Sequence, residues 1–215
     1  MAKNIEVNSE YVLPSTGYFK ITRHEEGKTH TYKLLDKMTP AMTQDKLAEF
    51  YESEKQKGNP LPLNSIQTFE LLQDAVISGD SDLMNHLQKD LRRGVNTLSR
   101  AIYNPLGKDD ETIHNYGTSD VYTIIRDIVG RDGFIDSIDN PDALESLLGT
   151  KDIKNINKIS NAINKTPICF MRVNSKPSQK IERVVRFDAS SDWLFLDAFG
   201  DLSYEYPAFF VEKIK

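Results

Sequence analysis

The residues of this sequence whose types and spacing are best suited to chemistry are cationic and lie in its last third. Residues 150–187 hold nine basic and two acidic residues, a net charge of +7, although the 215-residue chain as a whole carries −5. We call residues 150–187 the basic island. Such a cluster can bind a polyanion, because each neutralised phosphate releases counterions. Six residues are the candidate binding residues: Arg172, Asn174, Lys176, Lys180, Arg183 and Arg186.

The same charges have a second interpretation, in which they are neutralised within the chain. Residues 103–149 hold three basic and ten acidic residues, a net charge of −7, and residues 188–215 carry −4. The basic island can therefore dock on acidic segments of its own chain, or form a solvated face, and this internal interpretation is favoured because charged helix faces are usually just exposed. Asp197 is the predicted partner of an arginine on a neighbouring strand, since an unpaired covered charge is too costly.

A polar segment before a predicted helix carries the second set of candidates. Asn104–Thr118 is poor in core residues and is expected to be a long loop, and long loops are often functional. His114 is the candidate general acid or base, Tyr116 assists it, and Arg126 stabilises developing negative charge, with Arg172 or Arg183 in the same role. These residues predict a metal-independent enzyme that cleaves phosphodiesters. The competing interpretation is that Thr118, Ser119 and Asp120 form an ordinary N-cap.

Several kinds of site are excluded by the motifs. The sequence contains no Gly-rich phosphate loop and no nucleophile elbow. Four scattered histidines and the single cysteine, Cys169, do not make a zinc site, and Cys169 lies in an apolar strand. A calcium loop that began at Asp132 would place Phe134 where an oxygen ligand is needed. We expect no metal and no cofactor.

Composition predicts a folded, soluble protein. Leucine, isoleucine, valine and phenylalanine make up about a quarter of the chain, enough to bury a core. No run approaches the roughly 18 apolar residues of a membrane helix, so no membrane partner is expected. Met1–Glu10 lacks the apolar core of a secretory signal, and one cysteine allows no internal disulfide. A cytoplasmic location follows as an expectation.

The N-terminal quarter predicts a β-hairpin followed by a helix. Tyr18–Arg23 and Thr29–Leu34 are β-prone runs joined by a turn with a glycine, and Thr43–Lys57 has helical spacing and ends at Gly58. Pro60 and Pro62 mark a connector. We therefore divide the chain into a hairpin-plus-helix lobe over residues 1–62, which packs on the rest or stands apart, and a second part over residues 63–215.

The remaining chain predicts helices and then strands. A central region of about five helices is expected over residues 64–79, 81–105, 121–130, 140–149 and 150–165, the second of them with Gly94 inside it. An antiparallel sheet of three to four strands follows, over residues 168–174, 181–187, 193–199 and 206–214. Strands gathered at the ends and helices in the middle indicate an α+β fold.

Three functions are compatible with these features. The first is a non-enzymatic module that binds nucleic acid or an acidic protein through the basic island, and the second is the phosphodiester-cleaving enzyme built on His114. The third is a structural or assembly protein, which the sequence does not separate from the first. The oligomeric state stays open.

Overall fold

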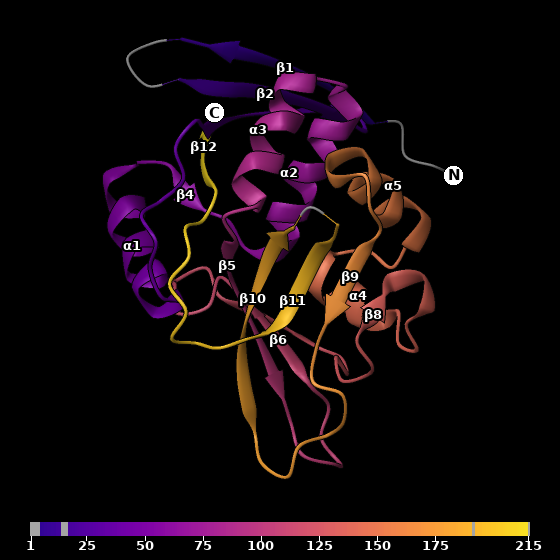
Figure 1. Cartoon of the computed structure of the whole chain (residues 1–215). Coiled ribbons are helices and arrows are strands. Elements are labelled where there is room, and N and C mark those ends of the chain that lie inside the picture. The colour runs from indigo at the N-terminus through magenta and orange to yellow at the C-terminus, as the bar shows by residue number, and fades with distance from the viewer. Residues whose placement is uncertain (1–4, 14–16, 191, 215) are drawn as a thin grey trace.

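The computed structural model describes residues 5–13, 17–190 and 192–214, and these residues form an α+β fold with two β-sheets (Figure 1). The predicted fold class is confirmed at this level. The described residues contain five α-helices and one short 3-10 helix: α1 (Gln44–Lys57), α2 (Ser65–Ser78), α3 (Ser81–Leu91), η1 (Ile135–Ser137), α4 (Asp142–Leu148) and α5 (Ile153–Asn164).

The first sheet is built from both ends of the chain. It has five strands in the order β1 (Ile5–Val12), β2 (Tyr18–Glu25), β3 (Lys28–Leu35), β12 (Phe210–Ile214) and β4 (Leu61–Pro62). Strands β1, β2 and β3 form an antiparallel meander, which confirms the predicted hairpin and adds a strand before it. The C-terminal strand β12 pairs with β3 and with β4, so the last residues of the chain complete the N-terminal sheet.

The second sheet contains the middle of the chain and most of the predicted C-terminal strands. Its seven strands run in the order β7 (Tyr122–Ile125), β6 (Glu111–His114), β5 (Val95–Tyr103), β10 (Ile181–Ala189), β11 (Leu194–Gly200), β9 (Ile168–Met171) and β8 (Gly133–Phe134). All neighbouring pairs are antiparallel except β9 with β11, which is parallel. The predicted separate antiparallel sheet of three to four strands is therefore wrong in extent, in one strand direction and in the place of β12.

Helix α2 lies between the two sheets and contacts β1 of the first and β5 of the second (Figure 1). Asn64 caps its start in a reciprocal capping box with Gln67, and Gly79 ends it in the left-handed conformation. One hydrophobic cluster joins Ile21 and Leu34 of the first sheet to Leu72 of α2 and Phe187 of the second sheet. The N-terminal strands therefore pack on the rest of the chain; the boundary at residue 62 stays a prediction.

The longest predicted helix, over residues 81–105, is half helix and half strand. Helix α3 ends at Leu91, and Gly94 has a φ of +73°, which closes the helix and turns the chain. A β-carbon on Gly94 would lie 2.7 Å from the ring of Tyr206. Residues Val95–Tyr103 form the central strand β5, in which every residue is buried. A strand buried on both faces shows no alternation, which explains why its apolar spacing resembled that of a helix.

The predictions for residues 104–130 were also wrong. The predicted loop contains strand β6, and the predicted helix over residues 121–130 contains strand β7. Val121, Tyr122 and Ile125 are exposed along β7, which is an edge strand. β-Branched residues supply most of this short apolar run, and they suit a strand as well as a helix.

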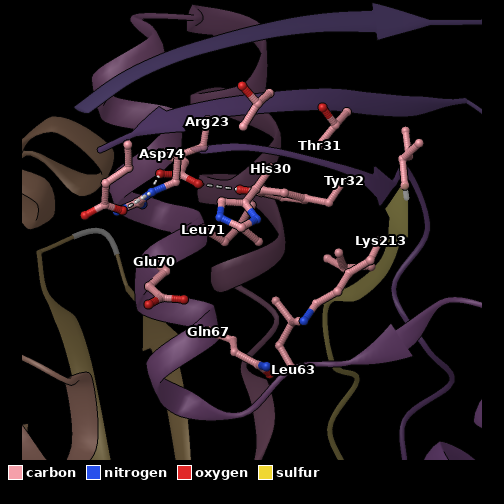
Figure 2. Close-up of a pocket in the computed structure, with 14 residues that line it drawn as sticks. Arg23, His30, Thr31, Tyr32, Leu63, Gln67, Glu70, Leu71, Asp74 and Lys213 are labelled. Atoms are coloured by element: carbon pink, nitrogen blue, oxygen red, sulfur yellow. Dashed lines mark hydrogen bonds and ion pairs between the residues drawn. The ribbon is translucent and has the colours of Figure 1, made fainter. Parts of the chain in front are cut away.

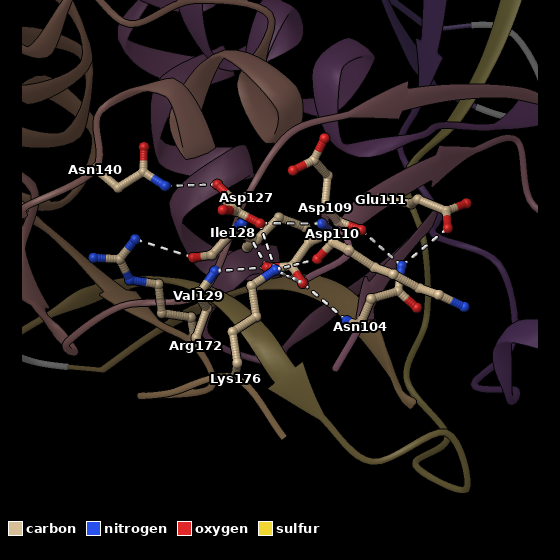
Figure 3. Close-up of polar contacts among 11 residues, drawn as sticks. Asn104, Asp109, Asp110, Glu111, Asp127, Ile128, Val129, Asn140, Arg172 and Lys176 are labelled. Atoms are coloured by element: carbon tan, nitrogen blue, oxygen red, sulfur yellow. Dashed lines mark hydrogen bonds and ion pairs between the residues drawn. The ribbon is translucent and has the colours of Figure 1, made fainter. Parts of the chain in front are cut away.

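Asp110 holds the segments around these strands together (Figure 3). Its side chain is fully buried and accepts hydrogen bonds from the backbone N–H groups of Asn104, Ile128 and Val129, at 2.9, 2.9 and 3.0 Å. The ammonium group of Lys176 lies 2.9 Å from the same carboxylate. One carboxylate thus satisfies three backbone donors and a cation from three separate segments.

We predict that Asp110→Ala lowers the free energy of unfolding by about 3 kcal/mol or more, because it leaves buried donors and a lysine without an acceptor. Asp109→Ala is the matched control, since the Asp109 side chain is exposed, and it should change stability by no more than about 0.5 kcal/mol. Urea unfolding followed by circular dichroism measures both. Equal stability of the two variants would show that Asp110 does not organise these segments.

Candidate functional site

His114, the predicted acid or base, is fully buried on β6. Its Nε2 atom lies 2.8 Å from the carbonyl oxygen of Ser146, which can only accept, so Nε2 carries the proton. Its Nδ1 atom then accepts from the Ser99 hydroxyl at 2.8 Å. Burial lowers the pKa of His114 to about 4, against the opposing effect of the Ser146 carbonyl. If Nδ1 of His114 also carried a proton, that N–H group would have no acceptor unless the Ser99 hydroxyl rotated its own proton away.

The other two predicted catalytic residues are engaged elsewhere. Tyr116 lies under the guanidinium of Arg100, whose central carbon is 3.3 Å from the ring centroid. Arg126 forms an ion pair with Glu145 at 3.2 Å. Neither lies at a helix N-terminus, because strand β7 follows Tyr116 and ends directly before Arg126. The catalytic role of His114, Tyr116 and Arg126 stays a prediction, with no shared cavity in its favour.

Arg172 and Asn174 of the basic island face the acidic segment 127–139. The Arg172 side chain is fully buried, with its guanidinium 2.6 Å from Asp139 and bonded to the carbonyl oxygens of Ile128 and Arg131. A β-carbon on Gly130 would lie 2.4 Å from that guanidinium, so glycine leaves the space that Arg172 fills. Asn174 accepts a hydrogen bond from the backbone N–H of Asp132.

The two lysines among the candidate binding residues also have carboxylate partners. Lys176 pairs with Asp110 and Asp127, and the hydrogen bonds to these carboxylates outweigh the effect of burial, so that its pKa is raised. Lys180 pairs with Glu182 at 2.6 Å and is otherwise exposed. Both lysines therefore lie beside acidic groups of their own chain.

Arg183 and Arg186 are associated with aromatic rings. The Arg186 guanidinium binds Asp197 at 2.6 Å, which confirms the predicted pairing of Asp197 with an arginine, and it lies 4.7 Å from the Tyr206 ring centroid. Arg183 lies 5.3 Å from the centroid of Phe199, a ring that is 51% exposed. Of the five basic residues among the predicted binding residues, Arg183 is the one for which the described residues include no carboxylate partner.

A cavity lies elsewhere, between α2 and the first sheet (Figure 2). Its volume is about 580 Å³, within the range of about 300–1,000 Å³ of small-molecule sites. The register of the sheet places Arg23 opposite His30 and Tyr32 opposite Lys213, so these four side chains share the face that looks toward α2. Helix α2 contributes four residues that lie on one helical face: Gln67, Glu70, Leu71 and Asp74. Three further apolar residues line the cavity: Leu63, Val211 and Ile214.

A buried ionic network forms one wall of this cavity. Asp74 is 2% exposed and accepts a 2.6 Å hydrogen bond from Arg23 and a 2.8 Å hydrogen bond from the Tyr32 hydroxyl (Figure 2). The Nε and Nη2 groups of Arg23 donate hydrogen bonds to Glu25. Burial raises the pKa of Asp74 even though Arg23 and Tyr32 oppose the rise, and burial together with Asp74 raises the pKa of Tyr32 well above its ordinary value. These groups are held in place by one another.

Two charged groups on the cavity walls have no such partners. Among the described residues, none donates a hydrogen bond to Glu70 or accepts one from Lys213, and the two side chains form no ion pair with each other. Both residues are exposed where they line the cavity. Desolvation by the neighbouring protein raises the pKa of Glu70, with Asp74 and Glu25 adding to the rise, and Arg23 and Lys213 opposing it. His30 also points into the cavity, with no hydrogen-bond partner among the described residues (Figure 2).

The residues of this cavity did not enter the sequence-based predictions. A signal was present at Asp74, an acidic residue within the apolar segment 69–77 of a predicted core helix, where a charged group requires a buried partner. The partners Arg23 and Tyr32 belong to the predicted hairpin, but nothing in the spacing of the residues indicates that this hairpin packs on α2.

Comparison of the chain with protein-family models, curated proteins and solved structures finds no match. The described residues contain no cluster of three or more histidine, cysteine, aspartate or glutamate side chains that could hold a metal ion. None of the helices in that part of the chain is long and apolar enough to cross a membrane.

We predict that burial of neutral His114 makes stability depend on pH. The pKa is lower in the folded state than in the unfolded one, so the contribution is present above pH 6.5 and is lost as pH falls toward 4. The loss should reach roughly 3 kcal/mol at pH 4. His114→Gln should flatten this part of the profile, and His24→Gln, at an exposed histidine, should not. Unfolding in urea between pH 4 and 7.5 measures the slopes; parallel wild-type and His114→Gln profiles would contradict the prediction.

Proposed function

We propose that this protein binds a small polar molecule in the cavity between α2 and the first sheet. The observation that carries the proposal is a cavity of about 580 Å³ lined by three polar groups, Glu70, Lys213 and His30, for which the described residues include no hydrogen-bond or ion-pair partner. Binding sites typically combine apolar walls with a few convergent polar groups, and titratable groups with shifted pKa values gather in them.

The geometry favours a preformed site. Asp74, Arg23 and Tyr32 fix the distance between α2 and the sheet, and the apolar side chains of Leu71 and Val211 line the cavity beside them. A ligand that enters does not have to pull these groups apart, because their hydrogen bonds are already made to one another. A preformed site loses less conformational entropy on binding than one that must be assembled.

The test is a thermal-shift screen of the full chain against free amino acids, polyamines, nucleosides, monosaccharides and dicarboxylates. A ligand at about 100 times its Kd adds about 2.7 kcal/mol of stability, a rise in Tm of roughly 5–10 °C for a chain of this size. His30→Trp should abolish the shift by filling the cavity. Lys28→Trp, at the exposed first residue of β3 and outside the cavity lining, should retain it.

Failure has two forms in this screen. If no compound raises the Tm of the wild-type protein, the cavity is not a site for these classes of molecule. If a compound raises the Tm of wild type and His30→Trp equally, it binds elsewhere. Isothermal titration with each active compound separates direct binding from an indirect effect on unfolding.

A second candidate function is binding of single-stranded nucleic acid at the basic island. One specific observation favours it: the half-exposed ring of Phe199 lies under Arg183, beside the exposed Tyr204, which stacks on Arg186. Bases stack on aromatic rings and on guanidinium planes with little dependence on sequence. The carboxylate partners of Arg172, Lys176 and Lys180 reduce the net positive charge of this surface, so the cavity remains the better supported site.

Fluorescence anisotropy with labelled single-stranded RNA and DNA tests this second candidate. We expect the affinity to fall steeply with salt. Phe199→Ala and Arg183→Ala should each weaken binding by about five- to a hundredfold, the loss of one stacked base, whereas Lys28→Ala should have no effect. Affinity that does not change with salt or in these variants would end the nucleic-acid proposal. Shortened product on a gel afterwards would support the phosphodiesterase alternative.

A further inference from the structure

The charges that face the cavity separate into paired and unpaired groups. Arg23 is neutralised by Asp74 at 2.6 Å and by Glu25 at 2.9 Å. Among the described residues that line the cavity, this leaves Glu70 on α2 as an anion and Lys213 on β12 as a cation without a hydrogen-bond or ion-pair partner. The cavity therefore offers one negative and one positive group on different walls.

This arrangement discriminates among ligand charges. A simple amine would be attracted by Glu70 but repelled by Lys213. A simple carboxylate would be attracted by Lys213 but repelled by Glu70. A second cationic group on a polyamine, or a second anionic group on a dicarboxylate, would find no unpaired partner, because Asp74, Glu25 and Arg23 already bind one another. A ligand with one charge of each sign satisfies both walls at once.

The geometry points to a zwitterionic α-amino acid with a large apolar side chain as the ligand of this cavity, its ammonium group at Glu70 and its carboxylate at Lys213. This inference rests on the proposed function. Glu70 and Lys213 line the same cavity without forming an ion pair, and they are close enough for Lys213 to lower the pKa of Glu70, so one ligand can present its ammonium group to the first and its carboxylate to the second. Leu63, Leu71, Val211 and Ile214 line the cavity with apolar surface, and a volume of about 580 Å³ leaves room for a large side chain against it.

Two hydrogen-bonding side chains extend this arrangement. His30 and Gln67 lie on opposite walls, on β3 and α2, and both reach the cavity (Figure 2). A ligand ammonium has three donors and a carboxylate accepts several hydrogen bonds, so Glu70 and Lys213 alone do not satisfy them. The amide of Gln67 and the imidazole of His30 can each donate or accept, and they complete the coordination of either end.

The experiment uses L-leucine, L-phenylalanine and L-tryptophan, each with its analogue lacking the carboxylate and its analogue lacking the amine. Isothermal titration to the full chain at pH 7 should show binding of at least one amino acid, and each of its two analogues should bind about tenfold more weakly or worse, the loss of one charged contact. Equal affinity of an amino acid and both of its analogues would overturn the inference.

Two variants test which end of the ligand binds to Glu70 and which binds to Lys213. Glu70→Gln should weaken the amino acid and its amine analogue about tenfold and should not weaken the carboxylate analogue. Lys213→Met should weaken binding of the amino acid and its carboxylate analogue about tenfold and should not weaken binding of the amine analogue. Glu49→Gln and Lys28→Met are the matched controls, at exposed positions outside the cavity lining, and should bind like wild type. The Tm of each variant, measured without ligand, confirms that it is folded.

The outcomes separate this inference from the proposed function. If a nucleoside, sugar or dicarboxylate binds, and His30→Trp abolishes that binding while no amino acid binds, the cavity is a ligand site but the zwitterion inference is wrong. If no compound of any class binds, both fail. If an amino acid binds but neither Glu70→Gln nor Lys213→Met weakens it, the assignment of the two charges is overturned.

Discussion

The burial of Asp74 is the constraint on which the organisation of the cavity depends. A carboxylate that is 2% exposed on a helix between two sheets must be paired, and its partners, Arg23 and Tyr32, come from two strands of the first sheet. Their hydrogen bonds join α2 to β2 and β3 at one wall of the cavity, while Ile21, Leu34 and Leu72 belong to the hydrophobic cluster that packs the same helix on the sheet. Beyond this network the helix and the sheet are not in contact across the whole face, and the space between them is the cavity.

The rest of the charge distribution follows the same rule of internal pairing. Most buried or half-buried cations of the basic island lie against carboxylates, as in Arg172 with Asp139, Lys176 with Asp110 and Arg186 with Asp197. The internal interpretation of the basic island thus describes these residues, although it does not by itself decide what the half-buried Arg183 and the exposed Phe199 do. Glu70 and Lys213 differ from these pairs, because they line a cavity and have no hydrogen-bond or ion-pair partner among the described residues.

Local signals predicted the parts of the fold that depend on local physics. Thr43 and Asn64 cap α1 and α2, Gly58 and Gly79 end them, and the hairpin forms around Gly27, because capping and turn geometry are decided within a few residues. The predictions failed where the pattern of apolar residues did not distinguish a strand from a helix. Strand β5 is buried on both faces, so its residues carry no period of two, and β7 is a short β-branched run that suits either structure.

The sequence by itself determined the α+β class, the boundaries of α1 and α2, the absence of common phosphate and nucleophile motifs, and the pairing of Asp197 with an arginine. Only the tertiary structure decided that β12 closes the N-terminal sheet, that His114 is buried as a neutral imidazole, and that Arg23, Tyr32, Glu70 and Lys213 meet around one cavity. The physical reason is separation along the chain. Capping and turns depend on residues a few positions apart, whereas this cavity joins residues from both ends of the chain. The local spacing of residues does not indicate which strand the last strand pairs with.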